Sequence, residues 1–96
     1  MSVYIVSAIE IHDPVVYAQW GELVRIAVAN FDIEVISTDD DATVFEGTKP
    51  ANHLGIVKFK SCEDYEAFVA SEAYQRALPY RLASSTVRFM MAMDAI

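Results

Sequence analysis

The chain has 96 residues, 54% of them hydrophobic, and a net charge of −7 at pH 7. This length predicts a single domain spanning residues 1–96, because one hydrophobic core typically serves about 100 to 150 residues. The excess of acidic side chains repels nucleic-acid backbones and anionic membrane surfaces, which argues against both as partners. The single cysteine, Cys62, excludes an internal disulfide framework and favours a cytoplasmic location.

The first third of the chain predicts a strand followed by a helix. Residues 3–11 are rich in β-branched side chains and end at the sequence HDP, which indicates a strand. Glu10 interrupts this apolar run, so we expect neither a signal peptide nor a membrane span there. Asp13 is suited to cap a helix and Pro14 to occupy its first position, so we expect a helix from Pro14 to about Asn30.

The middle of the chain predicts short strands. Residues 33–37 and 43–47 have the composition of a hairpin, joined by the acidic turn TDDD at 38–41. Residues 54–60 predict a central strand of the sheet.

The remaining residues predict a broken helix and a last strand. Ser61 and Asp64 form a capping box for a helix that ends near Ala70, and Ser71 provides a second cap. Pro79 lacks a backbone N–H, so we expect it to kink or end the second piece. Residues 85–96 predict the final strand.

We interpret the succession as the order β α β β α β of an α+β, ferredoxin-like domain. Its four-stranded antiparallel sheet would carry the helices on one face. Both alternating sets of residues 3–11 are mainly apolar, which predicts that both faces of the sheet are covered. A second copy of the chain would cover the open face and form a homodimer. An apolar ligand cavity on that face is the alternative.

Several short motifs follow one another in a recognisable order. They are DPVVY at 13–17, VFEGTKP at 44–50, VKF at 57–59 and SEAYQ at 71–75, followed by Arg81. In this order and spacing the chain resembles the family named domain of unknown function (DUF) 1330. The resemblance implies a ferredoxin-like protomer of the dimeric α/β-barrel superfamily, in which two four-stranded sheets face each other, and a family without an established reaction.

The sequence departs from that family pattern at positions that could shape a pocket. Asp32 and Ile33 stand where paired glycines are usual, and Lys49 stands where an aromatic residue is common. Asn52 and His53 replace basic residues before the central strand. A ligand shared with other members is therefore not implied.

Two residues are candidates for proton transfer. His53 precedes the central strand, and histidine ordinarily titrates near neutral pH, so it could act as a general base. Its alternative role is that of a partly exposed loop residue. Glu46 could be an acid or base if its strand turns it inward; alternatively, it pairs structurally with Arg81 or Arg88.

Four further residues are candidates for ligand binding. Arg81 could bind a carboxylate through its forked donors, and Tyr74 could line an apolar cavity. Tyr17 and Trp20 lie on the inward stripe of the first helix, where they form core or the wall of a cleft. Cys62 precedes two acidic residues and is interpreted as inert. The sequence contains no phosphate-binding loop, zinc constellation or flavin fingerprint, so we predict no metal and no cofactor.

These observations lead to two hypotheses about function. The first is a homodimer that binds a small anionic or aromatic metabolite between sheet and helices, with cofactor-independent oxygenase or isomerase activity by analogy of fold. The alternative is a non-catalytic interaction or ligand-sensing module, in which every polar residue above is structural. Convergence of Glu46, His53 and Arg81 on one cavity would favour the enzyme.

Overall fold

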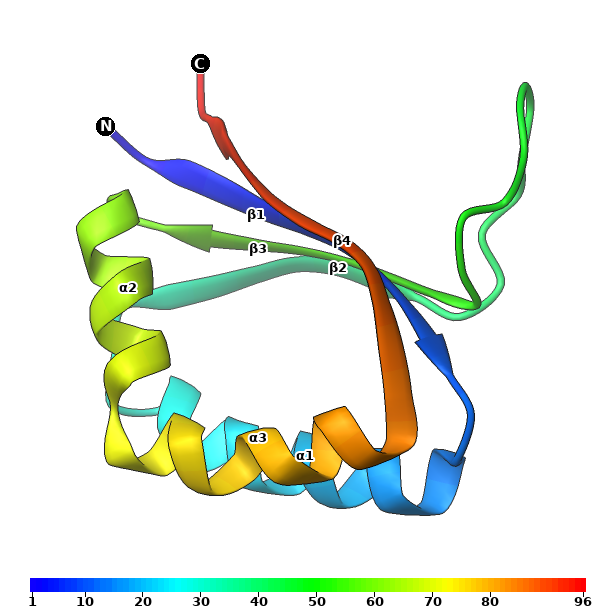
Figure 1. The fold of residues 1–96 in the computed structure, drawn as a ribbon. Coiled ribbons are helices and arrows are strands. Elements are labelled where there is room, and N and C mark those ends of the chain that lie inside the picture. Colours follow the sequence, from blue (N-terminus) through cyan, green and yellow to red (C-terminus); the bar gives the residue numbers. More distant parts are fainter.

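The fold is a four-stranded antiparallel sheet with all the helices on one side (Figure 1). It is described by a computed structural model of residues 1–96. The sheet has the order β2-β3-β1-β4. Its elements are β1 (Val3–Ile11), α1 (Pro14–Val28), β2 (Ile33–Asp39), β3 (His53–Phe59), α2 (Cys62–Ala70), α3 (Glu72–Ser84) and β4 (Ser85–Asp94). The predicted ferredoxin-like arrangement is therefore confirmed, with the second helix in two pieces.

Polar caps begin the helices at the positions that the sequence indicates. Asp13 directly precedes Pro14, and its carboxylate accepts hydrogen bonds from the backbone N–H groups of Val15 and Val16. The Ser61 hydroxyl accepts one from Asp64 N–H at 3.1 Å, and the Ser71 hydroxyl accepts one from Tyr74 N–H at 3.3 Å. These bonds satisfy N–H groups that have no partner within the first turn of a helix.

One predicted strand is absent, and two helix ends differ in detail from the expectation. Residues 43–47 form no strand. β2 continues to Asp39, and the strand that pairs with it is β3. The first helix ends at Val28 and not near Asn30. Pro79 does not end α3, which continues to Ser84; the carbonyl that loses its partner belongs to Gln75, an exposed residue that water can reach.

The core lies between the inner face of the sheet and the helices. Val3, Ile5 and Phe59 supply its sheet side, and Ala27, Phe68 and Tyr74 supply its helix side. Aromatic rings meet edge to face inside it: the ring centroids of Phe68 and Tyr74 are 5.0 Å apart. Such contacts orient the helices relative to the sheet.

The outer face of β1 and β4 also carries apolar side chains, in agreement with the alternating pattern of residues 3–11. Tyr4 pairs with Met93 and Val6 with Met91 across the β1–β4 ladder, so all four side chains lie on the face without helices. Met91 and Met93 are 53% and 57% exposed. None of the helices is long and apolar enough to cross a membrane.

Candidate active site between sheet and helices

A cavity of about 220 Å³ lies between the sheet and the helices, and 14 of its 18 lining residues are hydrophobic. It lies over a pair of small residues in the middle of the sheet: Ser7 on β1 is directly paired with Gly55 on β3. A Cβ atom added to Gly55 would lie 3.3 Å from the Ser7 Oγ. The inner face is therefore hollow where neither strand supplies a bulky side chain. Sequence reasoning missed both residues, although a lone glycine within a strand is a signal of close approach.

Aromatic side chains from the helices form much of the opposite wall. Tyr17 and Trp20 of α1, Tyr65 of α2 and Tyr74 of α3 all line the cavity. The rings of Trp20 and Tyr74 meet at 90° with their centroids 5.5 Å apart. The structure thus brings three of the four predicted ligand-binding residues, Tyr17, Trp20 and Tyr74, to one wall.

Arg81, the fourth of these residues, lies behind that wall and does not line the cavity. Its guanidinium carbon is 5.1 Å from the centre of the Trp20 ring, and its Nη2 donates to the Tyr74 hydroxyl at 3.3 Å. The residue is only 7% exposed, has no carboxylate partner, and its buried Nε has no hydrogen-bond partner. A buried cation without a counter-charge is costly and makes its surroundings favourable for an anion.

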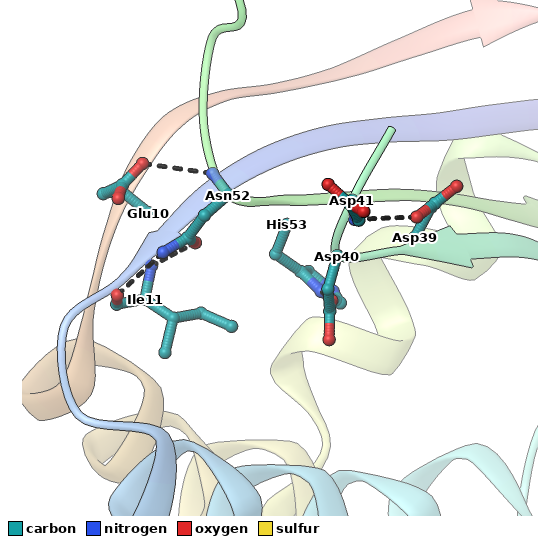
Figure 2. A network of polar contacts seen from close by, with 7 residues as sticks. All are labelled: Glu10, Ile11, Asp39, Asp40, Asp41, Asn52 and His53. Atoms are coloured by element: carbon teal, nitrogen blue, oxygen red, sulfur yellow. Dashed lines mark hydrogen bonds and ion pairs between the residues drawn. The ribbon is translucent and has the colours of Figure 1, made fainter. Parts of the chain in front are cut away.

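His53 lies at the start of β3 and lines the cavity, where its ring meets that of Tyr17 at a centroid distance of 5.6 Å. Its Nδ1 contacts the Asp40 carboxylate (Figure 2). In the tautomer whose Nδ1–H donates to the Asp40 carboxylate, Nε2 is the ring nitrogen without a hydrogen-bond partner in the protein. Sequence reasoning placed Asp40 in a turn and missed this contact, which depends on β2 and β3 being neighbours.

Asn52, the residue directly before His53, is hydrogen-bonded to the end of β1. Its side chain accepts a hydrogen bond from Ile11 N–H at 2.8 Å and donates one to the Ile11 carbonyl at 3.0 Å. Its own N–H donates to the Glu10 carboxylate at 3.1 Å (Figure 2). The amide therefore pairs with β1 much as a further strand residue would, and it fixes the entry of the chain into β3.

Two tyrosine hydroxyls in the cavity are held in their protonated form. Burial raises the pKa of Tyr17, although a hydrogen bond with Trp20 and the charge of Arg81 oppose the shift. Burial also raises the pKa of Tyr65, whose hydroxyl is 3.2 Å from the Met90 sulfur. Both phenols are thus neutral hydrogen-bond donors at physiological pH.

Glu46 does not join this group. It was expected on a strand, but it lies in the exposed connection between β2 and β3 and does not line the cavity. The cavity therefore collects His53 and the aromatic residues, with Arg81 behind them, whereas Glu46 lies elsewhere; the three residues do not converge, so the observation that would favour the enzyme is not made in the protomer. No three His, Cys, Asp or Glu side chains are grouped so that they could hold a metal ion.

Comparison with solved structures supports the fold and extends over nearly the whole chain. A protein of unknown function from Rhodopseudomonas palustris superimposes with a TM-score of 0.82 at 11% identity, covering 99% of this chain and 82% of that one. SnoaB, a cofactor-independent oxygenase from Streptomyces nogalater, has a TM-score of 0.71 at 12% identity and covers 99% and 93%. HapK from Hahella chejuensis has a TM-score of 0.67 at 12% identity and covers 100% and 93%.

At such identities the likeness concerns the fold alone. No curated protein matches the sequence. A family profile does match, over residues 2–95, and its description is Domain of unknown function (DUF1330). The chain belongs to the DUF1330 family.

Proposed function

We propose that the protein binds a one- or two-ring aromatic molecule bearing an acidic group in the cavity between sheet and helices. The observation that carries this proposal is the hollow over Ser7 and Gly55, walled by aromatic side chains. An apolar cavity of about 150 Å³ is sufficient to bind benzene, so about 220 Å³ accommodates a somewhat larger ring system.

The charge of Arg81 selects for an acidic group in this proposal. Its guanidinium has no counter-charge in the protomer and touches Trp20 and Tyr74, both of which line the cavity. Its charge also reaches Tyr17, where it lowers the pKa against the effect of burial. A carboxylate or ionised phenol in the cavity would supply the missing negative charge, with neutral Tyr17 as a hydrogen-bond donor.

The proposed reaction is cofactor-independent oxygenation or isomerisation. Both begin when a base removes a proton from a substrate carbon, and His53 is the one cavity residue suited to this role. Asp40 would orient the ring so that Nε2 accepts the proton, as carboxylates do beside catalytic histidines. The fold shared with SnoaB, a cofactor-independent oxygenase, supports the reaction class as an analogy only. Glu46 has no part in this mechanism.

The proposed assembly is a cytoplasmic homodimer in which two sheets meet through their open faces. The exposed Met91 and Met93, together with Tyr4 and Val6, support it, because a face of this composition is rarely left to water. The protomer is a slab of 35 × 34 × 16 Å. Its broad face can supply the roughly 800 Å² per partner that stable dimers bury.

A thermal-stabilisation screen followed by turnover assays tests the proposed function. The screen would contain one- and two-ring aromatic carboxylates and phenols, each beside its neutral analogue. We expect acidic members to stabilise the protein, and the best of them to consume oxygen or to exchange a carbon-bound proton with solvent deuterium. Binding without either reaction would identify the non-catalytic ligand-sensing alternative. Absence of any stabilisation would contradict the proposal.

A further inference from the structure

The connection between β2 and β3, residues 40–52, exposes apolar side chains at its tip. We call this segment the arm. Phe45 is 93% exposed and Val44 is 44% exposed. The arm leaves the sheet on the side away from the helices (Figure 1). Its tip thus extends on the same side as the open apolar face.

The base of the arm is firmly attached to the domain. Asp40 contacts His53 at one end, and Asn52 is hydrogen-bonded to Glu10 and Ile11 at the other. Ala51 is buried. The arm therefore leaves the domain in a direction set by contacts at both of its ends.

The tip, in contrast, makes no backbone hydrogen bonds of its own. No backbone N–H of residues 43–49 donates a hydrogen bond within the chain. Gly47 has a φ of 89°, a conformation that favours glycine and turns the chain at the tip. An exposed phenylalanine beside unpaired N–H groups is the composition of a contact surface.

We infer that the arm is a dimerisation element, and that Phe45 packs on a second copy of this chain. The inference rests on the proposed dimer, because the arm and the open face of the sheet lie on the same side of the protomer. When two such faces meet about a two-fold axis, each arm extends past its own sheet toward the partner. Each copy then buries the Phe45 of the other.

The same arrangement connects assembly to the candidate active site. The arm begins at Asp40 and is followed directly by His53, so a partner that holds the tip also restrains the two residues that form the proposed base. The pair is then best ordered in the dimer.

Three matched glutamate variants test the inference by sedimentation equilibrium over a range of concentrations. Phe45→Glu changes the arm, Met91→Glu changes the open face, and Leu82→Glu changes an exposed residue of α3, 63% exposed, on the helix side. We expect Phe45→Glu and Met91→Glu to raise the dimer dissociation constant by at least 100-fold and Leu82→Glu to leave it unchanged. Phe45→Ala should raise it about 10- to 100-fold, the loss expected for one buried phenylalanine.

The outcomes separate this inference from the proposed dimer. If Met91→Glu dissociates the protein and Phe45→Glu does not, the dimer stands and the role of the arm is wrong. A monomeric wild type overturns both. Because Phe45 contributes little to the core of the protomer, the melting of the dissociated variant should remain cooperative. Hydrogen exchange gives a second measurement: amides 43–49 should exchange slowly in the dimer and fast in Phe45→Glu, and fast exchange in a wild-type dimer would also overturn the inference.

Discussion

Asp40 and His53 lie 13 residues apart in the sequence, yet their side chains are in contact, because the arm leaves from β2 and returns to the adjacent β3. The contact occupies Nδ1 of His53 and leaves Nε2 as the ring nitrogen without a partner. It makes Asp40 a positioning residue of the proposed mechanism.

Replacing Asp40 with asparagine should therefore slow turnover more than it weakens binding. The amide can still contact the ring, but it no longer fixes the tautomer or stabilises the protonated imidazole, so we expect kcat to fall by about 10- to 100-fold with KM changed less than threefold. The comparison is a steady-state assay of the best substrate from the screen. Asp41→Asn is the matched control: it removes the same charge from the neighbouring residue, whose carboxylate is 3.9 Å from Lys49 Nζ. Equal losses in the two variants would contradict the role of Asp40.

Replacing Val24 with phenylalanine should fill the cavity without unfolding the protein. Val24 lines the cavity on α1, so the larger ring has space to occupy, and the free energy of unfolding should fall by less than about 1 kcal/mol. Urea denaturation measures this. In a fully packed core the same substitution would lower the free energy of unfolding by about 1–3 kcal/mol. A loss of that size would indicate that the cavity has no space for the larger ring. Val15→Phe, at a 73% exposed position of the same helix, controls for helix propensity.

Replacing Arg81 with methionine should separate binding of the acidic group from folding. The variant removes a buried charge whose Nε has no partner, so the loss of the contacts with Trp20 and Tyr74 is offset, and we expect stability to change by less than about 2 kcal/mol. Affinity for naphthoate should fall at least tenfold, while affinity for neutral naphthalenemethanol should stay constant in calorimetric titrations. Arg76→Met, which changes an exposed arginine of the same helix, is the control. A parallel loss for both probes would argue that Arg81 only supports the wall.

Asn52 should contribute measurably to stability through its two side-chain hydrogen bonds to Ile11. Asn52→Ala leaves the N–H and carbonyl of Ile11 without these partners, so we expect the free energy of unfolding to fall by about 1–3 kcal/mol. Asn30→Ala removes a single exposed hydrogen bond to the Ile26 carbonyl and should cost less than about 1 kcal/mol. Thermal or urea denaturation distinguishes the two, and similar values for both would show that Asn52 is not a special anchor.

Stability should decline above pH 10 because of the buried phenols. Burial raises the pKa of Tyr17 and Tyr65 above the ordinary value of 10.0. Below that pH both states keep their protons, and the stabilisation is complete. Above it the unfolded chain releases protons that the folded protein retains, so the free energy of unfolding falls as pH rises toward the raised values. Tyr17→Phe and Tyr65→Phe should each make this decline shallower, whereas Tyr80→Phe, at an exposed position, should not. An unchanged slope in both variants would contradict the effect of burial.

The sequence was informative where local chemistry decides the structure. Asp13, Pro14, Ser61 and Ser71 begin helices for reasons contained within one turn of chain. The alternation of residues 3–11 likewise indicates correctly that apolar side chains lie on both faces of β1. These signals require no knowledge of which strands are neighbours.

Prediction failed where the structure depends on which strands are neighbours in the sheet. Val44 and Phe45 have the composition of a strand, but no strand of the same chain lies beside them, and they form the exposed tip of the arm. The contact of Asp40 with His53 and the hollow between Ser7 and Gly55 depend on strand pairing, so neither can be found from local pattern alone. Glu46 was wrongly placed for the same reason.

Calorimetric titration of naphthoate into the wild-type protein and into Val24→Phe tests whether this cavity is a ligand site. We expect one naphthoate to bind each wild-type protomer and no detectable binding to the folded variant. Absence of binding to the wild type, or equal affinity for both proteins, would contradict a ligand site in this cavity.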